Sequence, residues 1–336
     1  MQILEHQSLQ PYNTFGIAAT ARYFVAIHSE EELRTALQLN IKPVFILGGG
    51  SNILLTQDFN GLVIKNSILG KEIINKTEDH VIIKIGAGEN WHETVRWSLA
   101  QNFGGLENLS LIPGTVGASP MQNIGAYGVE IKDVFHQLEA MERATGNIQV
   151  FDTAACQFGY RESIFKKALK DQYIITRVYY KLTLNNHIIN TTYGAIQEVL
   201  SAKNIINPTI HDVSDAVITI RSSKLPDPAK IGNSGSFFKN PEILPESYHI
   251  LKQQFPAMPA FPGENGKIKV PAGWLIEQCG WKGTRRGDAG CYDKQALVLV
   301  NYGNAKGAEI WQLALDIADS VEQKFGIRLT PEVNVI

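Results

Sequence analysis

The sequence predicts a folded chain that combines α-helices and β-strands in two or three domains. Three observations support this prediction. The 336 residues exceed one typical domain, which holds about 100–200 residues. Hydrophobic residues make up 44% and charged residues 19%, a composition typical of globular rather than disordered proteins. Short stretches with strand-like and helix-like spacing of apolar residues follow one another along the chain.

The charge balance argues against two kinds of partner. The chain has 31 Lys and Arg against 33 Asp and Glu, a formal net charge of −2. A nucleic-acid binder would show a strongly basic field, and a polybasic membrane anchor would need clustered Lys and Arg. The longest charge-poor stretch, residues 97–129, is interrupted by Pro113, Pro120 and several glycines, which a lipid-exposed helix would not tolerate. We therefore expect no nucleic acid and no membrane as partners.

The N-terminus and the cysteines indicate a cytoplasmic protein. Glu5 comes early, with no basic leader and no apolar core segment, so we expect no secretory signal. Cys156, Cys279 and Cys291 are odd in number and lack CxxC spacing, which favours reduced thiols over a redox or metal role. The eight histidines show no paired metal spacing, and we predict no metal site.

The first 66 residues are predicted to contain strands and one helix. Ser29 followed by Glu32 forms a capping box, and Leu33, Ala36 and Leu37 give the apolar face of a short helix. Apolar runs predict strands at residues 23–27, 44–47, 53–55 and 62–64.

The next part of the chain is predicted to be richer in strands. Trp91, Val95 and Leu99 form one helical stripe. Residues 104–128 have no clear period, and irregular segments this long inside a domain are usually functional. The remaining predicted elements are a strand at 81–85, a hairpin at 138–143 and 148–151, a strand at 173–184 and a helix at 212–222.

A rigid break follows, and we place a domain boundary there. Each proline in Lys224-Leu225-Pro226-Asp227-Pro228 disfavours helix in the residue before it. Residues 229–300 mix loops with short elements. Asn304 is predicted to cap a long helix through Lys324, with Gly326 as its stop. Residues 331–336 are predicted to form a short terminal strand.

Two glycine-rich loops fail the test for a dinucleotide fingerprint. In Gly48-Gly49-Gly50-Ser51-Asn52, Ile53 occupies the third glycine position and a strand follows instead of a helix. In Gly86-Ala87-Gly88, Trp91 occupies that position. Taken alone, each loop is more typical of a tight turn than of a nucleotide site.

A third loop, Ile112 to Gly128, is a stronger candidate for binding. It is long, nearly free of charge, and interspersed with hydroxyl and amide side chains. Glycine N–H groups can converge on an anion because no Cβ intervenes. We expect Ser119, Asn123 and the glycine amides to wrap a pyrophosphate and a flat heterocycle, although a purely structural loop is the alternative.

Three polar residues each allow a functional and an ordinary explanation. Arg161 follows Gly159-Tyr160, but a lone Arg is usually a surface charge. Ser236 lies where a Gly/Ser turn meets Phe237-Phe238; this would place its hydroxyl in dry surroundings, although spacing alone favours a β-turn. Ser236 is not in a Gly-x-Ser-x-Gly elbow, so hydrolase chemistry is not indicated. Glu332 near the chain end is typical of a solvated charge.

Taken in order, the segments resemble one family, the UDP-N-acetylenolpyruvoylglucosamine reductases of bacterial peptidoglycan precursor synthesis. Each match is weak alone, but the ordered set is specific and spans nearly the whole chain. Thr192-Tyr193-Gly194 resembles the type with a tyrosine-bearing loop over the substrate. The matching stretches are Asn13–Gly16, Ile46–Asn52, Gly86–Trp91, Gly105–Asn108, Ile112–Gly128, Phe158–Arg161, Thr192–Gly194, Arg221 with Lys224–Pro228, Gly235–Pro241, Ala272–Ile276, Gln295–Val300 and Pro331–Val333.

The resemblance implies an α+β protein with an FAD-binding fold of the vanillyl-alcohol-oxidase/PCMH type. This fold would comprise two α+β subdomains, residues 1–66 and 67–224. A smaller α/β substrate-binding domain, residues 225–326, would follow, and the tail 327–336 would return near the first subdomain. FAD would lie non-covalently between the subdomains. The implied cofactor-binding residues are Gly48, Gly49, Gly50, Ser51, Asn52, Ile112, Gly114, Thr115, Gly117, Ala118, Ser119, Ile124, Gly125, Ala126 and Arg221.

The implied activity is that of a UDP-N-acetylmuramate dehydrogenase, a flavoprotein oxidoreductase. It reduces UDP-N-acetylglucosamine enolpyruvate to UDP-N-acetylmuramate, with NADPH as the hydride-donating co-substrate. Arg161 matches the residue that pairs with the substrate carboxylate, Ser236 the proton donor, and Glu332 an acid that stabilises the intermediate by hydrogen bonding in its protonated form. The implied substrate-binding residues are Tyr193, Lys224, Asn240 and Gln295. The implied setting is a cytoplasmic monomer that serves cell wall biogenesis, cell shape and cell division.

One departure from the family and two other functions are left to test. Relatives are expected to carry Arg two residues after the terminal Glu, where this chain has Asn334, so the sequence leaves open how firmly Glu332 is held. An oxidase on the same scaffold would pass electrons to O2 and form peroxide. A non-catalytic binder of UDP-sugars would be colourless, because it would carry no flavin.

Overall fold

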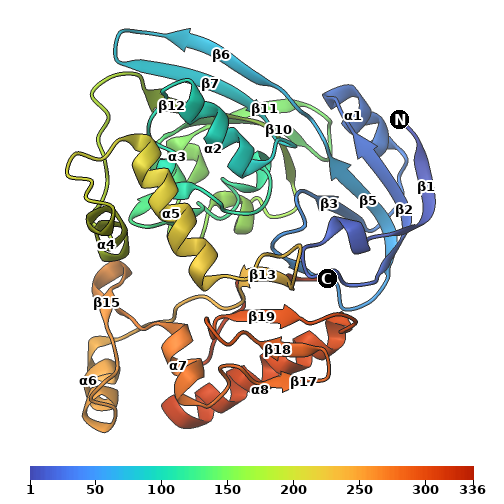
Figure 1. The fold of residues 1–336 in the computed structure, drawn as a ribbon. Helices are drawn as coiled ribbons and strands as arrows, with labels where there is room; N and C mark the ends of the chain where they lie inside the picture. Colours follow the sequence, from blue (N-terminus) through green and yellow to red (C-terminus); the bar gives the residue numbers. More distant parts are fainter. The chain divides into compact units, whose positions relative to one another are not determined.

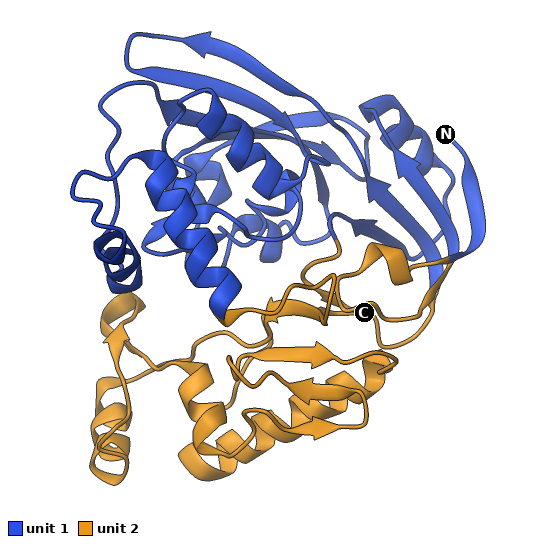
Figure 2. Ribbon diagram, viewed as in Figure 1, with its two compact units in different colours: residues 1–7, 22–49, 60–223 blue, residues 8–21, 50–59, 224–336 orange.

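The structure, a computed structural model, describes residues 1–336. Its packing divides the chain into two compact units (Figure 2). Unit 1 comprises residues 1–7, 22–49 and 60–223, and unit 2 comprises residues 8–21, 50–59 and 224–336. The last segment of unit 2 thus begins at Lys224, where the predicted proline break starts. The predicted functional division into three parts stays a prediction. None of the helices is both long enough and apolar enough to span a membrane.

A four-stranded sheet, mostly of unit 1, has the order β1-β2-β5-β3 (Figure 1). The strands are β1 (Ile3–Ser8), β2 (Thr20–Ile27), β3 (Val44–Leu47) and β5 (Phe59–Asn66), and β3 and β5 are parallel. Helix α1 (Glu30–Gln38) follows β2, and the predicted cap is confirmed because the Ser29 side chain accepts from Glu32 N. The Glu32 carboxylate accepts from His28 N at 2.7 Å, so the reciprocal bond of the predicted capping box is made one residue earlier.

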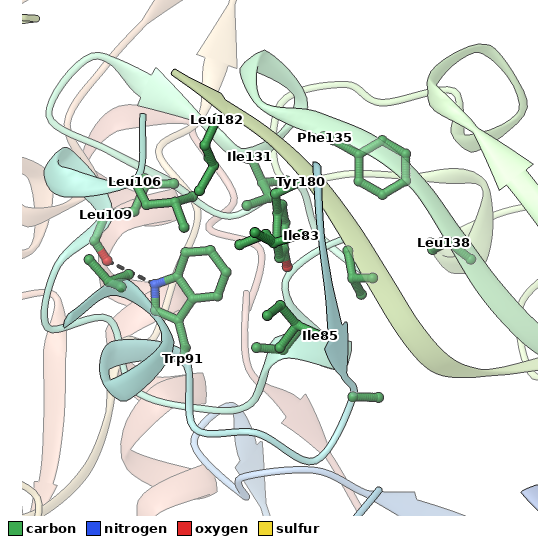
Figure 3. Close-up of a cluster of buried hydrophobic side chains, with 14 of the residues drawn as sticks. Ile83, Ile85, Trp91, Leu106, Leu109, Ile131, Phe135, Leu138, Tyr180 and Leu182 are labelled. Atoms are coloured by element: carbon green, nitrogen blue, oxygen red, sulfur yellow. Dashed lines mark hydrogen bonds between the residues drawn. The ribbon is translucent and has the colours of Figure 1, made fainter. Parts of the chain in front are cut away.

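The second sheet of unit 1 is antiparallel, in the order β11-β10-β12-β7-β6. Its strands are β6 (Lys71–Lys76), β7 (His80–Gly86), β10 (Phe135–Glu142), β11 (Ile148–Asp152) and β12 (Tyr173–Thr183). The predicted hairpin is confirmed by the β10–β11 pairing. Helix α2 (Trp91–Ala100) buries its predicted stripe in the same core as the sheet. There Trp91 meets the Tyr180 ring edge-on at 5.9 Å and donates its indole N–H to Leu109 O at 2.8 Å (Figure 3).

The rest of unit 1 consists of short elements and two longer helices. The predicted irregular segment 104–128 is confirmed, since it holds only 3-10 turns and a two-residue strand. The remaining elements are η2 (Glu107–Leu109), η3 (Val116–Ala118), β8 (Gly125–Ala126), β9 (Val129–Glu130), η4 (Ile131–Asp133), α3 (Thr153–Cys156), η5 (Ile164–Lys166), α4 (Gly194–Ala202) and α5 (Ile210–Lys224), whose last residue belongs to unit 2.

Unit 2 is organised around a four-stranded sheet of order β13-β19-β18-β17. The buried face of helix α8 (Gly307–Phe325) packs against β18 and β19. The other elements of the unit are η1 (Gln10–Tyr12), β4 (Ile53–Leu54), β13 (Gly232–Ser236), β14 (Glu242–Ile243), α6 (Pro245–Gln254), β15 (Phe261–Pro262), η6 (Glu264–Gly266), β16 (Ile268–Lys269), α7 (Ala272–Gln278), β17 (Arg285–Arg286), β18 (Ala289–Cys291), β19 (Val298–Asn301) and β20 (Asn334–Val335).

The predicted ends of α8 are half right. Gly326 is confirmed as its stop, with φ at +66°, a left-handed conformation that glycine adopts without strain. The predicted cap at Asn304 is wrong, because the N-cap is Lys306. The backbone N–H of Lys306 donates to the Glu309 carboxylate at 2.7 Å. A Cβ on Gly307 would lie only 1.8 Å from Leu55 O, so the first turn of the helix also packs closely on neighbouring backbone.

Candidate active site

Two glycine-containing loops that are distant in sequence meet in unit 1. Gly48 and Gly49 directly follow β3. A Cβ on Gly49 would lie 2.7 Å from the Gly114 Cα atom, and one on Gly48 would lie 2.8 Å from Thr115 Oγ1. Contacts this close require glycine. The structure therefore brings the start of the first predicted cofactor loop against the third.

The carbonyl groups of this junction are bonded to the surrounding scaffold. Gly48 O accepts from the Lys65 ammonium at 2.6 Å, and Gly114 O accepts from Trp91 N at 3.0 Å. An anion is repelled by carbonyl oxygens and attracted by N–H groups and cations, so this arrangement suits a phosphate. Burial lowers the pKa of Lys65. Sequence reasoning missed Lys65, which looks like an ordinary charge at the end of an apolar strand.

The Gly86–Gly88 loop lies against the third loop and bonds to its backbone. Gly117 N donates to Ala87 O, and Val116 N donates to Glu89 O, both at 2.9 Å. A Cβ on Gly117 would lie 2.6 Å from the Ala87 Cβ. The backbone of the Gly86–Gly88 loop thus packs against the third loop and supports it.

The side chains of two loop residues expected at a pyrophosphate have partners within the protein, and their roles at a ligand stay predictions. The Ser119 hydroxyl bonds Val116 O at 2.7 Å and the Tyr180 hydroxyl at 2.8 Å, and Ser119 is 1% exposed. Asn123 is 0% exposed and donates its amide to Gly159 O at 3.1 Å. Both side chains are buried and hydrogen-bonded within the protein, while their backbone belongs to the third loop.

Arg161 lies at the tip of a tight hairpin. Gly159 and Glu162 pair through both backbone bonds, and Arg161 between them has a left-handed φ of +55°. Its Nη2 donates to Gly125 O at 2.7 Å. The predicted catalytic arginine is therefore held against Gly125, a predicted cofactor residue.

Arg221 on α5 joins the same region. Its Nε donates to Leu111 O at 3.2 Å, and Tyr127 lies close enough to act on the charge of its side chain. Burial, followed by the charge of Arg161, lowers the pKa of Arg221. The Tyr127 ring meets the exposed Tyr193 ring edge-on at 5.1 Å. Unit 1 thus gathers two guanidinium groups and two tyrosines around the third loop, a setting suited to an anionic ligand. Sequence reasoning did not select Tyr127, whose only signal is an aromatic ring within that loop.

In unit 2, two predicted catalytic residues lie on neighbouring backbone. Ser236 ends β13, and the next residue, Phe237, accepts from Glu332 N through its carbonyl at 2.8 Å. Asn52 Nδ2 donates to Glu332 O at 3.2 Å. The Glu332 backbone is thus held on both sides, by the serine segment and by the last residue of the first glycine-rich loop.

Asn334 completes this arrangement. Its backbone N–H and its side-chain amide both donate to Asn52 O at 3.0 Å. The predicted terminal strand is confirmed as β20, which pairs with β4 in parallel. The residue that departs from the family pattern therefore ties the tail to the loop beside it.

Four other predicted site residues, Gly50, Ser51, Asn240 and Gln295, lie in unit 2. Gly50 packs on Tyr12, whose carbonyl oxygen would lie 1.9 Å from a Cβ, and Ser51 lies between Gly50 and Asn52. The predicted substrate residues Asn240 and Gln295 both lie at the first turn of α7. Asn240 Oδ1 accepts from Ala272 N at 2.9 Å, and Gln295 Oε1 is 3.0 Å from the Cβ position of Gly273.

The remaining predicted residues lie at the surface or on the loops already described. Lys224 is the exposed last residue of α5. Ser236 is exposed, so the dry surroundings expected for its hydroxyl are not formed by the protein alone. Ile112 and Ala118 belong to the third loop, and Ile124 and Ala126 flank Gly125. No three His, Cys, Asp or Glu side chains are grouped to hold a metal.

Comparisons with known proteins agree along the whole chain. A family model described as "FAD binding domain" matches residues 21–152, and one described as "UDP-N-acetylenolpyruvoylglucosamine reductase, C-terminal domain" matches residues 227–336. The reductase of Flavobacterium johnsoniae is 55% identical over 337 residues, covering 100% of both chains. Those of Amoebophilus asiaticus (49%, 100% of both chains) and Pseudomonas putida (47%, 100% of this chain and 99% of the relative) are also similar.

A solved structure supports the fold over nearly the full length. The crystal structure of the reductase (MurB) from Thermus caldophilus matches with a TM-score of 0.67 and 24% identity, covering 99% of this chain and 98% of that one. Together with the family matches, this confirms the predicted α+β flavin-binding fold followed by a smaller C-terminal domain.

Proposed function

The chain belongs to the UDP-N-acetylenolpyruvoylglucosamine reductase family, and on that premise we propose that it reduces UDP-N-acetylglucosamine enolpyruvate to UDP-N-acetylmuramate with NADPH, using FAD. The observation that carries the proposal is the 55% identity over the full length. It is supported by the bond from Glu332 N to the carbonyl of Phe237, the residue after Ser236. The protein would thereby supply a precursor of peptidoglycan.

The residues of unit 1 fit an FAD diphosphate. Neither Gly49 nor Gly114 has a Cβ, so the backbones of the two loops approach each other closely. The Gly48 carbonyl accepts from Lys65 and the Gly114 carbonyl from Trp91 N. Gly48, Gly49, Gly114 and the residues around them would hold the diphosphate. When bound, FAD supplies the two-electron redox chemistry that links NADPH oxidation to reduction of the substrate double bond.

The substrate chemistry defines what the side chains must do. A hydride adds to the vinyl CH2 carbon, and negative charge develops on the neighbouring carbon and its carboxylate. A proton then adds to that neighbouring carbon, which completes the reduction of the double bond. The site therefore needs a cation for the carboxylate and a proton donor.

Arg161 is suited to the first task. A guanidinium has five N–H donors in a planar fork that matches two carboxylate oxygens. The bond from Nη2 to Gly125 O fixes the direction of the fork. Arg161 also has a left-handed backbone, and such strain in a non-glycine residue is typical of functional positions.

Ser236 and Glu332 are assigned to proton transfer and stabilisation. A serine hydroxyl is a weak acid, so it donates a proton only to a strongly basic carbanion and where water is excluded. Substrate would have to cover the exposed Ser236 to meet that condition. Glu332, whose backbone is fixed by Phe237 and Asn52, would in its protonated form donate a hydrogen bond to the same developing charge.

The remaining assignments concern the UDP-sugar and the biological setting. Tyr193, Lys224, Asn240 and Gln295 would bind the UDP-sugar, with Lys224 as a point charge for its diphosphate. We further propose a cytoplasmic monomer that acts on small molecules and contributes to cell wall biogenesis, cell shape and cell division.

Separate measurement of the two half-reactions tests this function. FAD-loaded protein should oxidise NADPH over many turnovers only when the enolpyruvate substrate is present, because without it NADPH can reduce the flavin only once. Ser236→Ala should slow flavin reoxidation by substrate roughly 10²–10⁴-fold, the usual contribution of a general acid, while NADPH still reduces the flavin. Ser234→Ala is the matched control, because its buried hydroxyl has no hydrogen-bond partner.

The outcomes separate the alternatives. No substrate-dependent turnover would sink the reductase proposal. Rapid peroxide formation by the reduced protein would indicate an oxidase, and a colourless preparation that binds UDP-sugars would indicate a simple binder. Equal loss of both half-reactions in Ser236→Ala would contradict the proton-donor role alone.

A further inference from the structure

A strained leucine precedes the third loop. Leu111 has a left-handed φ of +58°, which a leucine rarely adopts, and Ile112 directly follows it. Non-glycine residues keep this conformation only where their surroundings impose it. The direction in which the chain enters the Ile112–Thr115 segment therefore depends on what holds Leu111.

Two side chains hold the Leu111 backbone, one at each polar group. Leu111 N donates to His92 Nδ1 at 2.9 Å, and Leu111 O accepts from Arg221 Nε at 3.2 Å. His92 lies in the first turn of α2, and Arg221 lies near the end of α5. The strained residue is thus clamped between two helices that are more than a hundred residues apart in sequence.

The residues just before Leu111 are held by the same helices. Leu109 O accepts from the Trp91 indole on α2 at 2.8 Å (Figure 3), and the Ser110 hydroxyl bonds that of Ser214 on α5 at 2.8 Å. Three successive residues are therefore tied to α2, to α5, and finally to both. The direction of the backbone over these three residues is thus set by hydrogen bonds to the two helices.

The hydrogen bond defines the state of His92. A backbone N–H can only donate, so Nδ1 must carry no proton and Nε2 must carry it. Burial, and then the charges of Arg96 and Arg221, lower the pKa of His92, and Glu93 alone opposes them. The neutral, accepting imidazole is thus the favoured form near neutral pH.

We propose that His92 is a positioning residue of the cofactor site, which together with Arg221 fixes Leu111 in its left-handed conformation and so directs the Ile112–Thr115 segment toward the FAD diphosphate. The proposal rests on the FAD-binding function above. His92 touches neither cofactor nor substrate in this role. It acts only through the Leu111 backbone.

An isosteric pair of variants tests the proposal in the full-length chain. Flavin is removed, FAD is titrated back, and the quenching of flavin fluorescence gives the dissociation constant. His92→Asn keeps an acceptor near the Nδ1 position and should bind FAD within about twofold of the unaltered chain. His92→Leu has nearly the same shape but no acceptor, and its dissociation constant should rise about tenfold, equivalent to about 1.4 kcal/mol.

A double-mutant cycle separates positioning from helix packing. Glycine adopts a left-handed φ without strain, so in a Leu111→Gly background the effect of His92→Leu should shrink to about twofold. Equal effects in both backgrounds, or equal affinities of His92→Asn and His92→Leu, would overturn the proposal. If the unaltered chain binds no FAD, the proposed function fails instead, which is a distinct result.

A second pair covers the case in which His92→Leu does not fold. Leu111→Asn favours the left-handed conformation and Leu111→Ile disfavours it. With His92 intact, only Leu111→Ile should weaken FAD binding, by at least fivefold. Equal binding by these two variants would show that the conformation of residue 111 does not matter to the site, and the proposal would be wrong.

Discussion

Replacing Gly49 with alanine tests the close approach of the two cofactor loops. The new Cβ would lie 2.7 Å from Gly114 Cα, 3.1 Å from its carbonyl carbon and 3.4 Å from Thr115 N. All three neighbours are backbone atoms, so no side chain can rotate away. The loops must move apart by about 0.7 Å to reach ordinary contact at 3.4 Å, and overpacking of this kind costs about 1–3 kcal/mol. Gly49 does not need a positive φ, so the effect is purely steric.

The assay combines thermal unfolding of the flavin-free chain with FAD titration. Gly49→Ala should lower the melting temperature by several degrees and weaken FAD binding about tenfold or more, because the displaced loops are those assigned to the diphosphate. Gly194→Ala is the control, since nothing lies within 4 Å of its Cβ position and alanine in a helix is favourable. If Gly49→Ala binds FAD as tightly as Gly194→Ala, the assignment of this junction to the cofactor is wrong.

Three further predictions concern buried groups and the C-terminal tail. Burial raises the pKa of Glu107, so its carboxyl group binds a proton more tightly in the folded chain than in the unfolded chain. The folded chain therefore loses stability as the pH rises from about 4.5, the ordinary pKa, through the raised pKa of the folded state. Glu107→Gln should therefore raise the melting temperature at pH 8 and leave it unchanged at pH 4, as calorimetry would show. Burial raises the thiol pKa of Cys156 and Cys291 to about 12, so a thiol reagent at pH 8 should modify the half-buried Cys279 first and all three only after unfolding. Asn334→Ala removes the side-chain hydrogen bond to Asn52 O and keeps the backbone one. It should lower the free energy of unfolding measured in urea by about 0.5–1.5 kcal/mol.

Elements with a complete local signal were predictable from sequence. Helix α1 carries its cap at Ser29 and an apolar stripe, and α2 carries Trp91 in a regular stripe. Helix α4 was missed because it has no side-chain cap, and α6 because it buries only Tyr248. Short helices without a wide apolar face depend on tertiary contacts that a local pattern does not contain.

The site was predictable in its residue types but not in its geometry. Glycine loops and the Ser236 turn are visible in the sequence. The separation between the first and third loops is about sixty residues, and only the fold shows that Gly49 meets Gly114. Likewise, the support of Glu332 by Asn52 crosses 280 residues. No local rule links such distant positions.

Strain explains why the supporting residues escaped detection. Leu111, Tyr127 and Arg161 all have φ between +50° and +60°, and all lie at the candidate site. Leucine, tyrosine and arginine carry no preference for this conformation, so the sequence gives no sign of it. Two of the three are held by partners: His92 and Arg221 bond the Leu111 backbone, and a hairpin surrounds Arg161. Unfavourable backbone at three positions of the candidate site, two of them held by hydrogen bonds, indicates that these residues specify the shape of a binding surface rather than stabilise the fold.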